Sequence, residues 1–217
     1  MKLYYLAGAC STAAMISLIE AGQKFDAISV DRATRRTSDD KAFNAVNPKG
    51  YVPALILDNG ELLTENVAVL SYIASLDKSG KLGPAPGTAD HFRLLESLAY
   101  VSSEVHKNFS PLFNPDADDS MRGIFKENLK KRLAYIEQHL GSAQYLTGDN
   151  FSVADAYLYV VLSWRDRVGV DISAFPNLIT FYERVRARPS VAQAIAFRAC
   201  PADPGISSSL ASAFVPS

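Results

Sequence analysis

The stretch NPKGYVPALILDNGELLTE, Asn47 to Glu65, decides the fold class because it encodes an antiparallel hairpin. Asn59-Gly60 lies between the apolar runs ALILD and ELLT, and this dipeptide predicts a type I′ turn, whose two central residues both need φ > 0.

Pro53 precedes the first strand of this hairpin. Because proline cannot donate to a strand ladder, it predicts a turn, a sheet edge or a cis bond that leaves neighbouring backbone groups free. Such an edge can bind an extended peptide as an added strand, and a plain loop proline explains the pattern equally well.

The residues before this hairpin predict a parallel βαβ unit. Lys2 to Leu6, KLYYL, is apolar and aromatic enough for a buried strand. Ser11 to Ala21 has the composition of a helix, and Gly22 follows it at the position that favours a left-handed residue. Phe25 to Asp31 alternates in polarity and predicts a second strand. Two strands joined by a helix are parallel by topology, so an antiparallel pair follows a parallel one.

The same reading divides the chain into two domains. ENVAVLSYIASLD, directly after the hairpin, predicts a helix with one apolar face, so residues 1–77 are expected to form an α/β unit in the order β-α-β-α-β-β-α. Residues 78–87 concentrate Gly, Pro and Ser and have no periodicity, as expected of a linker. Residues 88–217 are expected to form an all-helical domain.

Four segments predict the helices of this second domain. A helix from Asp90 to Phe109 pairs with one from Arg122 to Leu140. The apolar face of the latter is expected to contain Ile124, Leu129, Leu133, Ile136 and Leu140. The run from Phe151 to Val168 is apolar all round and predicts one helix central to the bundle, and Phe175 to Pro189 predicts another. The tail from Pro201 carries no prediction.

The segment FSVADAYL predicts the start of the central helix. Ser152 is followed three residues later by Asp155, which is the spacing of a capping box, and Phe151 is placed for a hydrophobic staple. Asp155 is therefore interpreted as a helix-starting residue, and Ser152 with Asp155 is not half of a hydrolase triad.

Composition limits the function classes. The 217 residues contain 22 Lys+Arg and 23 Asp+Glu, with a pI near 6.3, so the chain shows neither a nucleic-acid footprint nor a polybasic membrane patch. No segment approaches 18 uninterrupted apolar residues and no signal peptide opens the chain, so we expect no membrane contact and a cytoplasmic location. Cys10 and Cys200 provide neither a disulfide framework nor a zinc-type spacing. No metal is expected.

Cys10 is the first candidate for chemistry. It stands where a strand ends and a helix begins, and the unpaired N–H groups and positive dipole end of a helix favour thiolate over thiol. The alternative is a small core-filling cysteine, with Ser11 as the helix N-cap. Because position 13 is Ala13, no C-x-x-C disulfide can form, and any redox role passes through a mixed disulfide with an external thiol.

Two further groups of polar residues could line a site. Glu65 and Asn66 open a helix, where backbone N–H groups suit a carboxylate and the Glu65 side chain suits an amine. The alternative is that Thr64 caps the helix and Glu65 offsets its dipole.

The segment SSEVHKNFSPLF places four residues on one helical stripe, which either lines a site or faces water: Ser103, His106, Lys107 and Ser110. His106 titrates near neutrality and could serve a thiol as a hydrogen-bond partner or proton carrier.

These pieces, in this order, resemble a bacterial glutathione S-transferase, most closely the beta class. The resemblance runs from Met1 to about residue 200 and rests on KLYY with Cys10, NPKGYVPAL, LTENVAVLSYIA, HKNFSPLF and FSVADAYLYVVLSW. It implies an α/β thioredoxin-like N-terminal domain, an all-α C-terminal helical bundle, and a homodimer that binds glutathione at the domain interface. It also implies that Pro53 is cis.

The resemblance also implies roles for single residues. The Val52 backbone, beside Pro53, pairs with the cysteinyl part of glutathione, and Glu65 and Asn66 hold the γ-glutamyl group. Cys10 faces the glutathione sulfur, by a hydrogen bond or a mixed disulfide, with His106 close by. Arg35 and Lys107 lie near the glycyl end, and Glu104 contacts the glutathione of the other subunit. Ser11 and Tyr5 are the second and third partners for the thiol.

At two positions the chain departs from the family pattern. Asn66 stands where Ser is frequent, which changes the side-chain contact but keeps the backbone N–H. Arg35 stands where Lys is frequent, which keeps the charge but changes its reach.

Three functions fit this resemblance. The first is a detoxifying glutathione transferase that presents a glutathione thiolate to a hydrophobic electrophile held against helical-domain side chains such as Phe109, Phe113 and Trp164. The second is a glutathione-dependent thiol-disulfide reductase or reductive dehalogenase in which Cys10 acts covalently. The third is a non-enzymatic protein that binds apolar ligands or oxidised glutathione.

Overall fold

A four-stranded mixed sheet organises the N-terminal part of the chain. The computed structural model describes residues 1–199, and residues 200–217, including Cys200 and the tail from Pro201, lie outside the described part. The strands are β1 (Lys2–Tyr5), β2 (Asp26–Ser29), β3 (Ala54–Ile56) and β4 (Leu62–Thr64), in the order β2-β1-β3-β4. β1 is parallel to β2 and antiparallel to β3, and β3 is antiparallel to β4. The predicted succession of a parallel pair and an antiparallel pair is confirmed.

The hairpin forms where it was predicted, but its turn is of a different type. The Leu57 N–H donates to the Glu61 carbonyl at 2.9 Å, and the Gly60 N–H donates to the Leu57 carbonyl at 3.0 Å. Gly60 has φ +87°, whereas Asn59 is not among the described residues with positive φ. Only one left-handed residue is therefore used, as in a longer hairpin loop that ends in a glycine bulge, so the predicted type I′ turn is wrong.

Side chains alternate across the sheet and fill two cores. Leu3 and Tyr5 face the main core with α1 (Ser11–Glu20) and α3 (Asn66–Leu76), while Tyr4 faces a smaller cluster that contains Phe43 of α2 (Phe43–Val46). Helix α1 ends as predicted, with Gly22 at φ +61° just beyond it.

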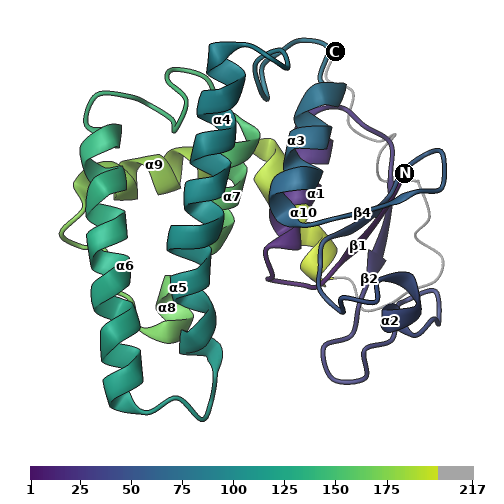
Figure 1. Cartoon of the computed structure of the whole chain (residues 1–217), viewed down its shortest axis with the longest axis horizontal. Coiled ribbons are helices and arrows are strands. Elements are labelled where there is room, and N and C mark those ends of the chain that lie inside the picture. Colours follow the sequence, from purple (N-terminus) through teal and green to yellow (C-terminus); the bar gives the residue numbers. More distant parts are fainter. Residues whose placement is uncertain (200–217) are drawn as a thin grey trace.

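The described elements after α3 are all helical; most of them form the left lobe of Figure 1, and α10 (Pro189–Ala199) lies beside α1. These elements are α4 (Ala89–Tyr100), the π-helical η1 (Val101–His106), α5 (Lys107–Phe109), the 3₁₀-helical η2 (Ser110–Phe113), α6 (Asp119–Leu140), α7 (Val153–Leu162), α8 (Arg165–Val168), α9 (Pro176–Arg186) and α10. Helix α7 is buried along its whole length, as predicted for a central helix. The α/β sheet domain and the helical domain together confirm the expected fold class.

Three local predictions for the helical domain are wrong. The helix from Asp90 to Phe109 is interrupted by the π segment η1, which changes the faces that its residues present. Ile124, expected on the apolar face of α6, is 60% exposed. The run from Phe151 to Val168 breaks after Leu162 into α7 and the short α8, which ends at the left-handed Gly169.

The two domains share one apolar core. Helix α1 packs against α3 on the sheet side and against α7 and α10 on the helical side, and a single cluster of buried residues runs from Leu3 through Leu70 to Leu158. Two polar contacts cross the same boundary: Trp164 Nε1–H donates to the Gly8 carbonyl at 2.8 Å, and Arg188 makes a bidentate pair with Glu20. Along residues 1–199, none of the helices has both the length and the apolar character needed to span a bilayer.

The predicted capping box is present at the start of α7. The Asp155 carboxylate is fully buried and accepts from the Ser152 N–H at 2.8 Å, the Ser152 hydroxyl at 2.7 Å and the Leu146 N–H at 2.8 Å. One side chain therefore starts the central helix and also anchors the loop before it.

Replacing Asp155 by Ala is expected to lower the free energy of unfolding by about 3 kcal/mol or more, because three donors, two of them buried, lose their acceptor. The exposed neighbour Asp149 provides the control, since Asp149→Ala should change stability by less than about 0.5 kcal/mol. Urea unfolding followed by circular dichroism measures both. Equal, small effects of the two substitutions would contradict the role of Asp155.

Candidate functional site

Cys10 lies at the junction of the first strand and α1. It is the residue that precedes α1, and its Sγ–H donates to the Val52 carbonyl at 3.3 Å. Ser11 is the first residue within the helix, so its predicted place as N-cap is wrong. The Ser11 hydroxyl is fully buried, where the Leu6 N–H donates to it at 3.2 Å. The thiol of Cys10 therefore lies beside the Val52 backbone, and the Ser11 hydroxyl is directed into the loop behind it.

Burial controls the protonation of Cys10. Desolvation raises the pKa of the thiol to about 11, and hydrogen bonds from the backbone N–H groups of Cys10 and Ser11 offset it only in part. The expectation that the helix N-terminus favours thiolate is therefore wrong here, because the loss of solvation exceeds the stabilisation from the N–H groups. Near neutral pH Cys10 is a thiol and can donate a hydrogen bond.

The loop before β3 brings the backbone of Val52 to Cys10. The Val52–Pro53 peptide bond is cis, as the family resemblance implied. Arg35 stabilises this loop from the other side, since its guanidinium donates to the Gly50 carbonyl and stacks over the Phe43 ring at 5.5 Å. Arg35 thus lies at one end of the segment that carries Val52.

Glu65 and Asn66 form the other wall of the site. Glu65 is the residue that precedes α3, so the alternative in which Thr64 caps the helix is wrong. Its φ of +70° is in the left-handed region, which disfavours every residue except glycine, and such strain is concentrated at functional positions. The Glu65 carboxylate is exposed and accepts from Lys49 Nζ at 2.9 Å.

Asn66 connects this wall to Cys10. Its Nδ2–H donates to the Cys10 carbonyl at 3.4 Å. Its Oδ1 is buried and has no hydrogen-bond partner within the described residues. An unpartnered buried acceptor is costly, and it is a feature of sites that are completed by another molecule.

His106 reaches the site from the helical domain. It is the last residue of η1 and is half-buried, and its Nδ1 lies 2.6 Å from the Tyr157 hydroxyl. Desolvation, with a smaller effect of Lys107, lowers the pKa of His106 to about 4, so its imidazole is neutral at physiological pH. Tyr157 was missed from the sequence because a tyrosine in an apolar helix has the pattern of an ordinary core residue.

An aromatic cluster surrounds His106. The ring of Trp164 lies 4.9 Å from that of His106, 6.1 Å from Phe109 and 5.6 Å from Phe113, measured between centroids. Phe113 is 38% exposed, so the cluster opens to solvent on one side. The three aromatic residues expected to hold an electrophile are thus brought together.

Other predicted residues lie elsewhere or have other partners. Within the predicted stripe, Ser103, Lys107 and Ser110 are exposed while His106 turns inward, because the π segment alters the helical repeat. Glu104 forms an ion pair with Arg132 at 2.7 Å, and the Tyr5 hydroxyl donates to the Phe197 carbonyl at 3.0 Å.

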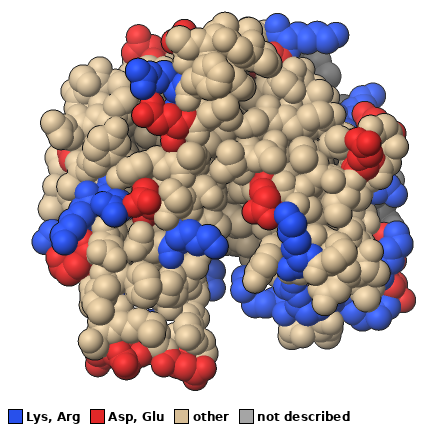
Figure 2. Space-filling view, in the orientation of Figure 1, with Lys and Arg blue, Asp and Glu red and all other residues tan. Residues whose placement is uncertain are grey.

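Positive charge gathers near the site on the sheet domain. Figure 2 shows Lys and Arg concentrated over the lower right lobe, where Figure 1 places α2, and a notch separates this lobe from the helical domain. The sequence around α2 contains Arg32, Arg35, Arg36, Lys41 and Lys49. Arg36, Lys41 and Lys49 form ion pairs with Asp40, Asp39 and Glu65, so the attraction of this side for an anionic ligand is weaker than the number of cations suggests. No group of three or more potential metal ligands occurs within residues 1–199.

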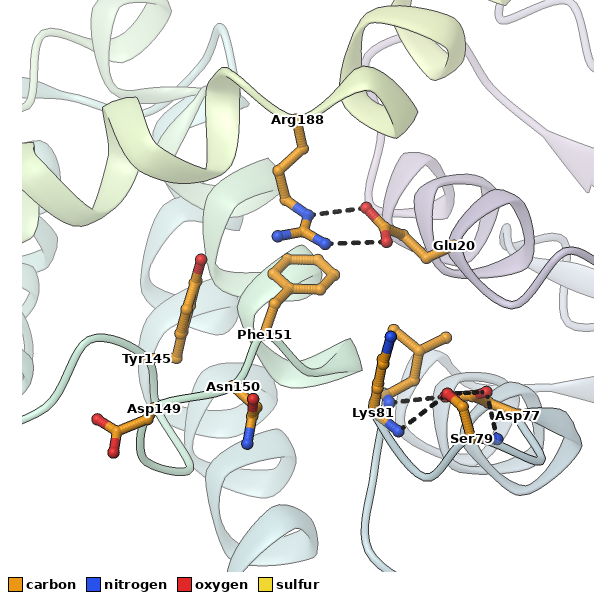
Figure 3. Close-up of a pocket in the computed structure, with 10 residues that line it drawn as sticks. Glu20, Asp77, Ser79, Lys81, Tyr145, Asp149, Asn150, Phe151 and Arg188 are labelled. Carbon is orange, nitrogen blue, oxygen red and sulfur yellow. Dashed lines mark hydrogen bonds and ion pairs between the residues drawn. The ribbon is translucent and has the colours of Figure 1, made fainter. Parts of the chain in front are cut away.

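A separate cavity lies at the opposite end of α1. It has a volume of about 350 Å³ and is lined by Glu20, Tyr145, Phe151 and Arg188, among others. Figure 3 shows the guanidinium of Arg188 between the Glu20 carboxylate and the Phe151 ring, 4.0 Å from the ring centroid. Because α1 has ten residues, this cavity is about 15 Å from Cys10 along the helix. None of the residues predicted for glutathione contributes to its lining.

Comparison with known proteins assigns the family. Residues 7–76 match the model of the glutathione S-transferase N-terminal domain, and residues 103–198 match that of the glutathione S-transferase C-terminal domain. The chain belongs to the glutathione S-transferase family. The enzyme class predicted from the sequence, a glutathione transferase, is therefore confirmed.

Individual relatives agree with this assignment. Glutathione S-transferase GstA of Escherichia coli O157:H7 is 38% identical over 90% of this chain and 97% of its own. A sphingomonad glutathione S-transferase, solved in complex with glutathione, superposes with a TM-score of 0.89 at 43% identity, covering 93% of this chain and all of its own. A beta-class glutathione S-transferase of Sphingomonas chungbukensis does so with a TM-score of 0.87 at 44% identity, covering 91% and 98%.

The protonation of Cys10 can be tested by alkylation. In a Cys200→Ser background, iodoacetamide is expected to react with Cys10 at pH 7 on the order of 10- to 100-fold more slowly than with free cysteine, because a pKa of about 11 leaves little thiolate. The rate should rise about tenfold for each pH unit from 7 to 10, since the thiolate fraction does so below the pKa. A plateau below pH 8 would show instead that the helix N-terminus controls the thiol.

Proposed function

We propose that this transferase conjugates reduced glutathione to hydrophobic electrophiles, and that it is a beta-class enzyme. The observation that carries the proposal is the meeting of three separate segments at Cys10: its thiol donates to the Val52 carbonyl at 3.3 Å, and its backbone carbonyl accepts from the Asn66 amide at 3.4 Å. The beta class is supported by the similarity to the Sphingomonas chungbukensis enzyme and by the cysteine at the start of α1.

The residues present fit a bound glutathione. The strained backbone at Glu65 directs the first N–H groups of α3 and a carboxylate to one place, which suits the carboxylate and amine of a γ-glutamyl group. The unpartnered Asn66 Oδ1 provides one more acceptor there. Val52 would hold the cysteinyl part through its backbone, and Arg35 and Lys107 would attract the glycyl carboxylate.

The electrostatics of the site favour a thiolate supplied by the substrate. Cys10 is protonated and His106 is neutral near pH 7, so each can donate to a bound sulfur without first losing or gaining a proton, once the Cys10 thiol turns from the Val52 carbonyl. Donors of this kind lower the pKa of a bound thiol and bring its thiolate into position. The thiolate would attack an electrophile held against the exposed Phe113, with the buried Phe109 and Trp164 packed behind it, forming a carbon–sulfur bond as the leaving group departs.

The remaining predictions concern assembly and location. We propose a cytoplasmic homodimer that takes part in detoxification, with residues 1–77 as the glutathione-binding domain, 78–87 as the linker and 88–217 as the domain of the electrophile. In this arrangement Glu104 would contact the glutathione of the second subunit once its ion pair with Arg132 opens.

Calorimetric titration with reduced glutathione tests the proposal. One glutathione is expected to bind per subunit, and Glu65→Ala should weaken binding by about 10- to 100-fold because a charged hydrogen bond is lost. Glu61→Ala, on the exposed loop of the same hairpin, should leave the affinity unchanged. Absence of binding at millimolar glutathione would overturn the proposal. Binding without turnover of model electrophiles such as aryl halides would favour the non-enzymatic function.

Thiol-disulfide exchange is the second candidate function, and the contact between Cys10 and Val52 favours it because Cys10 lies where a cysteinyl sulfur would bind. Cys10→Ala should abolish mixed-disulfide exchange with glutathione and keep most of the conjugation rate, whereas Cys200→Ser should affect neither. Both rates are measured on the same preparations. Equal loss of both activities in Cys10→Ala would show that conjugation also needs the cysteine.

A further inference from the structure

Tyr157 places a polar group at the meeting point of both domains. It is 1% exposed and lies on α7, which packs against α1, α3 and η1. These three elements carry the groups at the candidate site: Cys10 precedes α1, Asn66 begins α3, and His106 ends η1. Buried tyrosine hydroxyls need hydrogen-bond partners, so the partners of this one define its role.

The hydrogen bond between Tyr157 and His106 is the contact on which this role depends. The Tyr157 hydroxyl lies 2.6 Å from His106 Nδ1, a distance at which one of the two groups donates to the other. Desolvation, with a smaller effect of the nearby Cys10, raises the pKa of Tyr157, and the side chains of Ser102 and Asn66 offset this only in part, so the hydroxyl keeps its proton and can donate it to a neutral imidazole.

A neutral imidazole that accepts at Nδ1 carries its proton on Nε2. We propose that Tyr157 is a positioning residue of the transferase: its hydroxyl holds His106 in the Nε2–H tautomer, so that Nε2–H is the donor offered to the glutathione sulfur. The inference rests on the proposed function. In the other tautomer the Nε2 lone pair would face the thiolate and repel it.

The geometry of η1 supports this role. Ser102 and His106 are four residues apart in η1, so their side chains lie on one face of it, toward Tyr157 on α7. The ring of Trp164 covers His106 at 4.9 Å, and its N–H is bound to Gly8, two residues before Cys10. The imidazole is therefore restrained on two sides, and the Tyr157 hydroxyl selects which nitrogen bears the proton.

Nitrogen NMR tests the tautomer without requiring turnover. With ¹⁵N-histidine labelling at pH 7, His106 is expected to show a single Nε2–H tautomer, assigned among the three histidines by its loss in His106→Gln. Tyr157→Phe should convert it into a mixture of tautomers. An Nδ1–H tautomer in the unaltered protein, or an unchanged Nε2–H tautomer in Tyr157→Phe, would overturn the proposal. The first of these outcomes is decisive even if the variant does not fold.

Kinetics then separate positioning from a merely structural role. Tyr157→Phe is expected to lower kcat for conjugation roughly 5- to 20-fold, with the KM for glutathione changed by less than about twofold, because the effect arises when the thiolate is stabilised. The matched control is Tyr159→Phe, which alters a buried tyrosine two residues along the same helix and should leave kcat unchanged. Equal losses in the two variants would show a packing effect and contradict the proposal.

A double-mutant cycle completes the test. In a His106→Gln background, Tyr157→Phe should change kcat by less than about twofold, since its effect is transmitted through the imidazole. Independent, additive losses would overturn the assignment. If the unaltered protein binds no glutathione, the proposed function fails, while the NMR experiment still decides whether Tyr157 sets the tautomer.

Discussion

The packing of α1 on both faces is the constraint on which the rest of the structure depends. Residues 11–18 are all buried, because the helix is covered by the sheet domain on one side and by α7 and α10 on the other. A helix held in this way has fixed ends. Its N-terminus places Cys10 against Val52 and Asn66, and its C-terminus places Glu20 in the bidentate pair with Arg188. The geometry of the candidate site and the packing of the domains are therefore properties of one element.

The same burial determines the charge state of the site. A helix N-terminus favours thiolate, but the desolvation of Cys10 is the larger effect and its pKa rises to about 11. Desolvation also keeps His106 neutral, with a pKa of about 4. The protein thus contributes uncharged donors, and positive charge stays on the surface around α2 (Figure 2). Such a division suits a reaction in which the substrate supplies the negative charge, because stabilising a thiolate that arrives with the substrate needs no buried countercharge.

Contacts at the candidate site join the two domains. Helix α7, which carries Tyr157, packs against α1 and α3 of the sheet domain, and the Trp164 N–H donates to the Gly8 carbonyl two residues before Cys10. A shift of one domain against the other would therefore move Tyr157 and His106 relative to Cys10 and Asn66. Asn66 holds the Cys10 carbonyl through Nδ2, and its Oδ1 has no partner within the described residues.

Local patterns in the sequence determined the order of strands and helices, the hairpin, the helix end at Gly22 and the capping box of Ser152 and Asp155, because each depends on residues close together in the chain. The same patterns singled out Cys10, Glu65, Asn66 and His106 as candidates. Only the tertiary structure decided how these residues behave. Four features depend on solvation or on partners dozens of residues away: the pKa of Cys10, the π-helical turn that directs His106 inward, the pairing of Glu104 with Arg132, and the contact of Tyr157 with His106. Desolvation and long-range hydrogen bonds are set by packing, and no local pattern of residues encodes them.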